Sequence, residues 1–123
     1  MSIDWLFDFE RAIDNGKEVY ACAGVGRNEW IIGKPIEELK KVAKRAAEHK
    51  KLPISIVRVI SKHDAIAGDL FLCPTSIDNP GPRGEPNIKW SAVETKEAAE
   101  MMRDVKQGPS PFFGIQVVET VAP

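Results

Sequence analysis

The sequence has few of the residues and patterns that mark specialised classes of protein. Its only cysteines, Cys22 and Cys73, are too few to form a disulfide framework. No segment approaches the roughly 18 to 20 consecutive apolar residues that a membrane-spanning helix needs. The N-terminus, Met1 to Trp5, lacks the basic and apolar regions of a signal peptide. We therefore expect a cytoplasmic protein without a membrane partner.

The sequence also has no excess of positive or of negative charge. Lysine and arginine number 17, aspartate and glutamate 18, and the net charge is −1. The chain as a whole therefore has no electrostatic attraction for nucleic acid. The segment 36–51 carries a basic run, but it lacks the interleaved aromatic residues that single-strand binding uses. We do not expect a nucleic-acid partner.

Catalytic motifs are absent or incomplete. The chain has no Gly-x-Ser-x-Gly element, no phosphate-binding loop and no zinc-ligand spacing. Gly24-Val25-Gly26 precedes a strand-like segment, whereas a phosphate-binding loop must open a helix, so we interpret it as a hairpin turn. His63-Asp64 looks like part of a metal-dependent phosphohydrolase signature, but the only other histidine is His49. We therefore expect no metal and no cofactor.

What remains is an ordinary globular composition, with 43% apolar and 28% charged residues. The length of 123 residues predicts one domain, 1–123. Hydrophobic periodicity predicts helices over 2–14 and 36–51, and a third that Thr95 caps. The predicted strands are Glu18–Ala23, Glu29–Ile32, Ile54–Ile60, Asp69–Cys73, Ile88–Val93 and Phe112–Val121.

These elements predict an α+β fold in the order α-β-β-α-β-β-β-α-β. The sheet should be mixed or mainly antiparallel, with about six strands covered by amphipathic helices. The β-branched run Ile54–Ile60 is typical of a central strand covered on both faces. The apolar C-terminal strand should also lie inside the sheet. In the third helix we expect a buried stripe of Ala98, Met101, Met102 and Val105, with Gly108-Pro109 ending the helix.

The segment 74–88 is the most distinctive part of the sequence. It holds four prolines and two glycines, which exclude a helix or a central strand. Connections of this length are uncommon in compact domains unless they are functional or disordered. Because the segment also carries Arg83, it is the first place to look for a site.

Arg58 is a second candidate, because it interrupts an apolar strand and its guanidinium must find an acceptor there. The simpler interpretation places it at the rim of the strand, in water or paired with a structural carboxylate. In the functional interpretation Arg58 lies at the floor of a pocket, and loops place Arg83 and Arg27 beside it. The planar arginine fork suits phosphate or carboxylate, and Trp90 would offer a stacking face.

These residues favour a small non-catalytic binding module whose partner is a small anionic molecule or an acidic protein surface. One alternative is a protein-directed inhibitor or immunity-type module that uses the basic helix 36–51. Another is a small acid–base enzyme that uses His63. A homo-oligomer through the first helix is a further expectation, because Phe7 lies off the apolar stripe of Trp5, Phe9 and Ile13.

Overall fold

The computed structural model describes residues 2–26, 29–78, 87–102, 104–105, 108–109 and 111–123. Its helices are α1 (Ser2–Asp14), α2 (Ile36–Lys50) and α3 (Lys96–Met102). Its strands are β1 (Val19–Ala23), β2 (Trp30–Ile32), β3 (Ile54–Ser61), β4 (Leu70–Asp78), β5 (Asn87–Val93), β6 (Asp104–Val105), β7 (Gly108–Pro109) and β8 (Phe113–Val121). The predicted α+β class and the predicted order of helices and long strands are confirmed.

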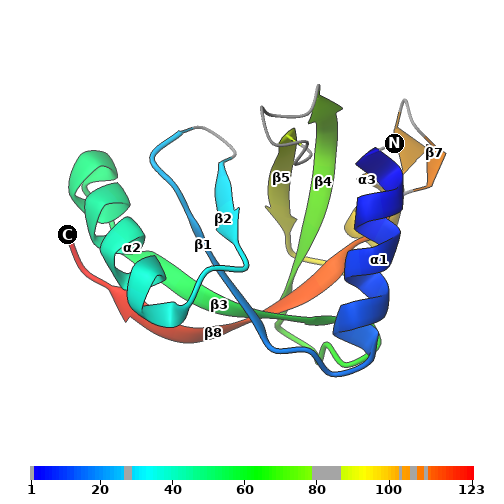
Figure 1. Cartoon of the computed structure of the whole chain (residues 1–123), viewed down its shortest axis with the longest axis horizontal. Helices are drawn as coiled ribbons and strands as arrows, with labels where there is room; N and C mark the ends of the chain where they lie inside the picture. The colour runs from blue at the N-terminus through cyan, green and yellow to red at the C-terminus, as the bar shows by residue number, and fades with distance from the viewer. Residues whose placement is uncertain (1, 27–28, 79–86, 103, 106–107, 110) are drawn as a thin grey trace.

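The longer strands form one six-stranded antiparallel sheet in the order β2-β1-β3-β8-β4-β5. As predicted, the C-terminal strand β8 lies inside the sheet, between β3 and β4. The short strands β6 and β7 form a separate two-stranded ladder that the sequence did not predict. The sheet is strongly curved, and the β1–β2 and β4–β5 hairpins rise from the same side of β3 and β8 (Figure 1).

Packing on the concave face explains this curvature. One buried apolar cluster joins Ala21 of β1 to Trp90 of β5, although β3, β8 and β4 lie between those two strands. Val57 of β3 belongs to the same cluster, and α1 covers it with Leu6 and Ile13. The sheet therefore folds over its own apolar face, and α1 closes part of the opening.

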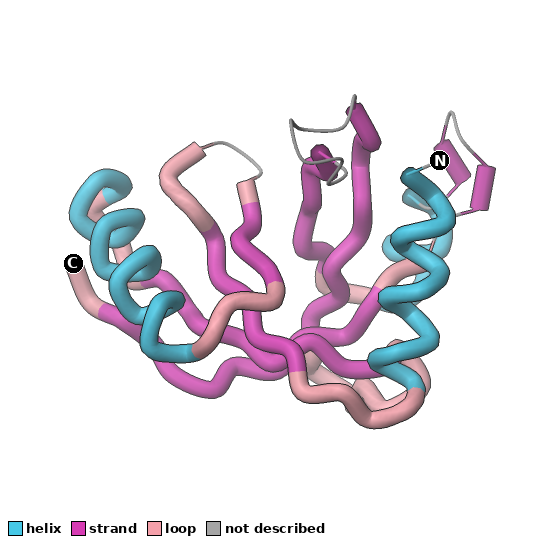
Figure 2. The backbone as a smooth tube through the Cα atoms, viewed as in Figure 1, coloured by secondary structure: helices cyan, strands magenta, loops and turns pink. Residues whose placement is uncertain are grey.

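The convex face carries the other two helices. Side chains alternate between faces along a strand, so Ile54 and Ile56 of β3 point away from Val57 and pack beneath α2. In the same way Phe71 of β4 packs against Ala99 of α3. The first two helices lie at opposite ends of the curved sheet (Figure 2). Arg58 of β3 and Gln116 of β8, which are paired in the sheet, belong to neither of these two buried clusters, and we call this part of the face the convex strip between α2 and α3.

The end of α1 and the start of α3 have the backbone geometry that their sequences favour. Helix α1 ends at Asp14, and Gly16 beyond it takes a positive φ of 90° that a side chain would disfavour. Before α3, the hydroxyl of Thr95 accepts a hydrogen bond from the Ala98 amide at 3.1 Å, as an N-cap residue does.

The predicted bounds of the proline- and glycine-rich loop, 74–88, were wrong at both ends, and the connection between the strands is shorter. Strand β4 continues to Asp78 and β5 begins at Asn87. Pairing of β4 with β8 stops at Leu72, so Pro74 has only β5 beside it, and the register shifts between Pro74 and Ser76. A proline without an amide hydrogen is tolerated where a strand has one neighbour and a bulge.

The predicted stripe of the third helix was also wrong in part. The helix ends at Met102, and Val105 lies in β6, which pairs with Gly108 of β7. Ala99 of α3 is fully buried, whereas Met101 is 79% exposed. In so short a helix, packing against Phe71 decides which face is buried, and the 3.6-residue period alone does not.

Candidate functional site

Arg58 lies in the middle of β3 on the convex strip between α2 and α3. Its neighbours Val57 and Val59 face the concave core, so the intervening side chain points to the other face. Arg58 is half-buried, and its Nε is buried with no hydrogen-bond partner. Within the part of the chain that the structure describes, no carboxylate lies at ion-pair distance from this guanidinium.

A row of polar side chains crosses the strip at the level of Arg58. In the register of the sheet, Arg58 lies opposite Tyr20 of β1 on one side and Gln116 of β8 on the other. The Nε2 of Gln116 donates to Asp69 Oδ2 at 3.2 Å, and that same oxygen accepts from the Ile66 amide at 2.9 Å. The Asp69 carboxylate at the end of this row is therefore engaged with donors other than Arg58.

The structure does not bring Trp90 to Arg58. Trp90 is 3% exposed and lies in the concave core, where its ring packs near Phe113 with a centroid separation of 6.2 Å. The two side chains thus lie on opposite faces of the sheet. Arg27 and Arg83, the other predicted site residues, lie outside the described residues.

A cleft opens beside Tyr20, at the edge of the sheet where β2 is too short to cover all of β1. Strand β2 pairs with β1 only from Ala21 to Ala23, and the Gly33 amide adds a last bond to the Tyr20 carbonyl at 3.0 Å. Gly33 then turns the chain towards α2 with a φ of 89°. The segment 18–20 is consequently flanked by α1 on one side and by the entry to α2 on the other.

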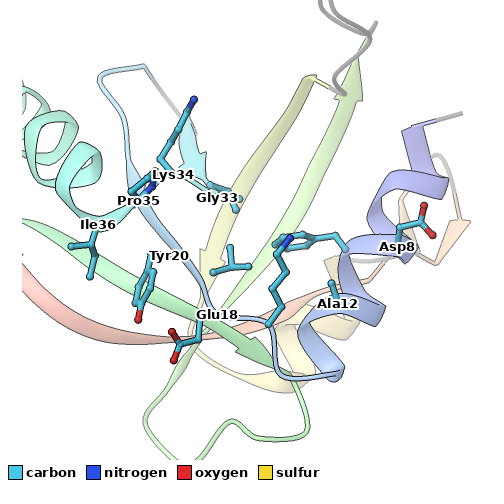
Figure 3. A pocket seen from close by; sticks show the side chains of 12 residues that line it. Asp8, Ala12, Glu18, Tyr20, Gly33, Lys34, Pro35 and Ile36 are labelled. Atoms are coloured by element: carbon cyan, nitrogen blue, oxygen red, sulfur yellow. The ribbon is translucent and has the colours of Figure 1, made fainter.

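The cleft has a volume of about 600 Å³. Its apolar lining comes from three parts of the fold: Phe9 and Ala12 of α1, Val19 of β1, and Ile32 and Ile36 around the β2–α2 connection. Its polar lining consists of Asp8, Lys17, Glu18, Tyr20 and Lys34. In Figure 3 the Glu18 and Tyr20 side chains extend to one side of the cleft and Lys34 extends to the other.

No sequence pattern predicts this cleft, because its residues are ordinary ones scattered over three elements. The one local pattern near the cleft is Gly33-Lys34-Pro35, and this pattern is equally typical of the start of a helix. Gln116 and Tyr20 were missed for the same reason, since only the strand register places them beside Arg58.

The cysteines and His63 are poorly placed for catalysis. Burial raises the pKa of both the Cys22 and the Cys73 thiols to about 11, so neither is a thiolate at neutral pH. His63 and Asp64 are exposed in the turn after β3, where the His63 amide donates to the Ser61 hydroxyl at 3.2 Å. Among the described residues, no three histidine, cysteine or acidic side chains gather closely enough to hold a metal ion.

The basic face of α2 is partly neutralised. Lys40 lies 3.7 Å from Glu119 of β8, and Lys44 lies 3.7 Å from Glu48 on the same helix. Both pairs are exposed, so each contributes little stability, but they lower the positive charge that this face offers to a partner.

None of the helices in the described residues combines the length and the apolar character needed to cross a membrane. Comparisons of the chain with protein-family models, with curated proteins and with solved structures find no match.

Proposed function

We propose that this protein is a non-catalytic binding module that holds the carboxylate or phosphate group of a small anionic molecule at Arg58. The observation that carries the proposal is the buried Nε of Arg58, which has no hydrogen-bond partner. A buried N–H donor without an acceptor costs free energy, and native proteins rarely keep such a group without a reason.

An oxyanion would satisfy this group in a way that the surrounding residues do not. The guanidinium fork presents parallel N–H donors that match two oxygens of a carboxylate or phosphate. Tyr20 and Gln116 flank Arg58 in register, and the Tyr20 hydroxyl is a further donor. The Asp69 Oδ2 accepts from Gln116 and from the Ile66 amide, so Arg58 takes no part in binding that oxygen and its own donors are left for the ligand.

The remaining parts of the proposal have independent support. The raised pKa values of the Cys22 and Cys73 thiols favour binding over thiol catalysis, and the exposed turn at His63 favours it over acid–base catalysis. A cytoplasmic location accords with two free cysteines. The ion pairs of Lys40 and Lys44 make an inhibitor that acts through α2 the weaker alternative.

The test is a titration of the full chain, with arginine labelled with ¹⁵N, against inorganic phosphate and against acetate at constant ionic strength. The Nε–H resonance of Arg58, assigned by its loss in the Arg58→Lys variant, should shift saturably at millimolar concentrations of one of these anions. Arg45, which is exposed on α2, is the control and should not shift. If Arg58 moves no more than Arg45 with either anion, the proposal is wrong.

A further inference from the structure

We infer that the cleft between α1, β1 and the entry to α2 is a second binding site, for a small monocarboxylate with an apolar tail. Arg58 does not line the cleft, although Tyr20 both lines it and lies opposite Arg58 in the sheet. Its volume of about 600 Å³ falls inside the range of about 300–1,000 Å³ that small-molecule sites occupy.

The apolar part of the inference rests on exposure inside the cleft. Val19 is buried at its floor, whereas Phe9, Ala12, Ile32 and Ile36 are only half-buried, and these side chains converge from α1, β2 and α2. Apolar surface that several elements present together in a concavity is typical of a ligand site, whereas isolated apolar residues on a convex surface are ordinary. An aliphatic or aromatic tail would cover this surface.

The charge of the ligand follows from the polar rim. Asp8 is paired with Arg11, which removes that carboxylate from consideration. Lys17, Lys34 and Glu18 are exposed, and none of them has an ion-pair partner among the residues that the structure describes. Among the unpaired charged residues that line the cleft, two ammonium groups and one carboxylate leave one positive charge, which matches a ligand with one negative charge.

The start of α2 adds little to this selectivity. A helix N-terminus attracts anions, but Glu37 and Glu38 already occupy the first turn of α2. We therefore assign the recognition of the carboxylate to the two lysines and the affinity for the tail to the apolar floor.

The experiment is a titration of the ¹⁵N-labelled full chain with octanoate, butanoate and octanol, each kept below the concentration at which it aggregates. Octanoate should shift the amide resonances of Ala12, Val19 and Gly33 saturably. It should bind more tightly than butanoate, by about fourfold for each added methylene that the floor covers. It should also bind more tightly than octanol, because octanol lacks the charge.

Three variants locate the site. Lys17→Met and Lys34→Met keep the aliphatic stems and should each weaken octanoate binding about threefold to fivefold, as expected of an ion pair at an exposed rim. The exposed Lys41 of α2 provides the matched control, so Lys41→Met should leave the affinity unchanged. Ala12→Phe should fill the cleft and abolish binding, with helix content checked by circular dichroism.

Several results would overturn the inference. Equal affinities for octanoate and octanol would remove the role of the lysines. Shifts centred on the separate groove of about 280 Å³ near Trp30, Leu70 and Val117 would place the ligand elsewhere. Loss of octanoate binding in Arg58→Met would assign the carboxylate to Arg58, whereas unchanged binding in that variant separates this site from the one proposed above.

Discussion

Arg58 of β3 lies opposite Gln116 of β8, and the side-chain amide of Gln116 donates to Asp69 at a distance of 3.2 Å. The two residues are neighbours in the register, but the hydrogen bond leads away from the guanidinium. This arrangement leaves Arg58 Nε buried without an acceptor. We therefore expect an anion that binds Arg58 to raise the free energy of unfolding of the protein.

We predict that Arg58→Met makes the free protein more stable. Removing a buried donor that has no acceptor relieves its desolvation cost, and the methionine side chain keeps much of the apolar contact. The expected gain in the free energy of unfolding is about 1 kcal/mol. Urea denaturation in an anion-poor buffer measures it.

The control for this variant is Arg45→Met, at an exposed position of α2, which should change stability by less than about 0.5 kcal/mol. A loss of stability in Arg58→Met that exceeds the control would mean that the guanidinium already has a partner in the free protein.

The cysteines predict a loss of stability at high pH. Burial raises the pKa of Cys22 and Cys73 from 9.0 to about 11, so above pH 9 the unfolded chain loses thiol protons that the folded chain retains. The stabilisation is complete below pH 9 and is lost as the pH rises to 11, by about 2 kcal/mol for each thiol.

Urea denaturation at several pH values from 8 to 11 tests this prediction, in the wild type and in a Cys22→Ala, Cys73→Ala variant. The variant lacks the thiols but keeps the lysines and the tyrosine, so its stability should fall less steeply. Parallel curves for the two proteins would contradict the proposed role of the thiols.

Gly114 of β8 leaves no room for a larger side chain. A Cβ at this position would lie 3.0 Å from the Ala65 Cβ and 3.0 Å from the Ile60 Cγ1. We expect Gly114→Val to lower the free energy of unfolding by about 1–3 kcal/mol through overpacking. Adding Ala65→Gly should recover part of the loss, and additive losses in the double variant would show that the contact is not the cause.

The exposure of Phe7 leads us to predict that the protein associates with itself through α1. It is 40% exposed on α1, beside Leu6, which is fully buried in the concave core. We expect the protein to form a homodimer through this face and Phe7→Glu to convert it to a monomer, as sizing with light scattering would report. Asp14→Lys alters charge on the same helix and should leave the assembly intact. A wild-type monomer, or a Phe7→Glu protein of unchanged mass, would refute the prediction.

Much of the fold was readable from local patterns. The β-branched run of β3 predicted a strand buried on both faces, and the structure packs Val57 and Ile56 into separate apolar clusters. The apolar spacing of α2 and the cap at Thr95 were read correctly in the same way. Met101 and Pro74 were misjudged, because their environments depend on Phe71 and on where β4 leaves β8.

The candidate site was less accessible to sequence reasoning. Arg58 was a candidate from the sequence, since a charged residue within an apolar strand is visible there. The sequence did not show that Arg58 lies opposite Tyr20 and Gln116. It also did not show that Trp90 lies on the other face of the sheet.

The sequence by itself determined where the helices and long strands lie, though not all of their ends and not β6 or β7, because that choice depends mostly on residues two to four positions apart. Only the tertiary structure decided which strands are neighbours, which face each side chain takes in the curved sheet, and that residues of α1, β1 and the β2–α2 connection enclose a cleft. Those relationships arise from pairings between residues far apart in the chain, such as Arg58 with Gln116. Their free energy depends on the packing of the whole sheet, which no local pattern contains.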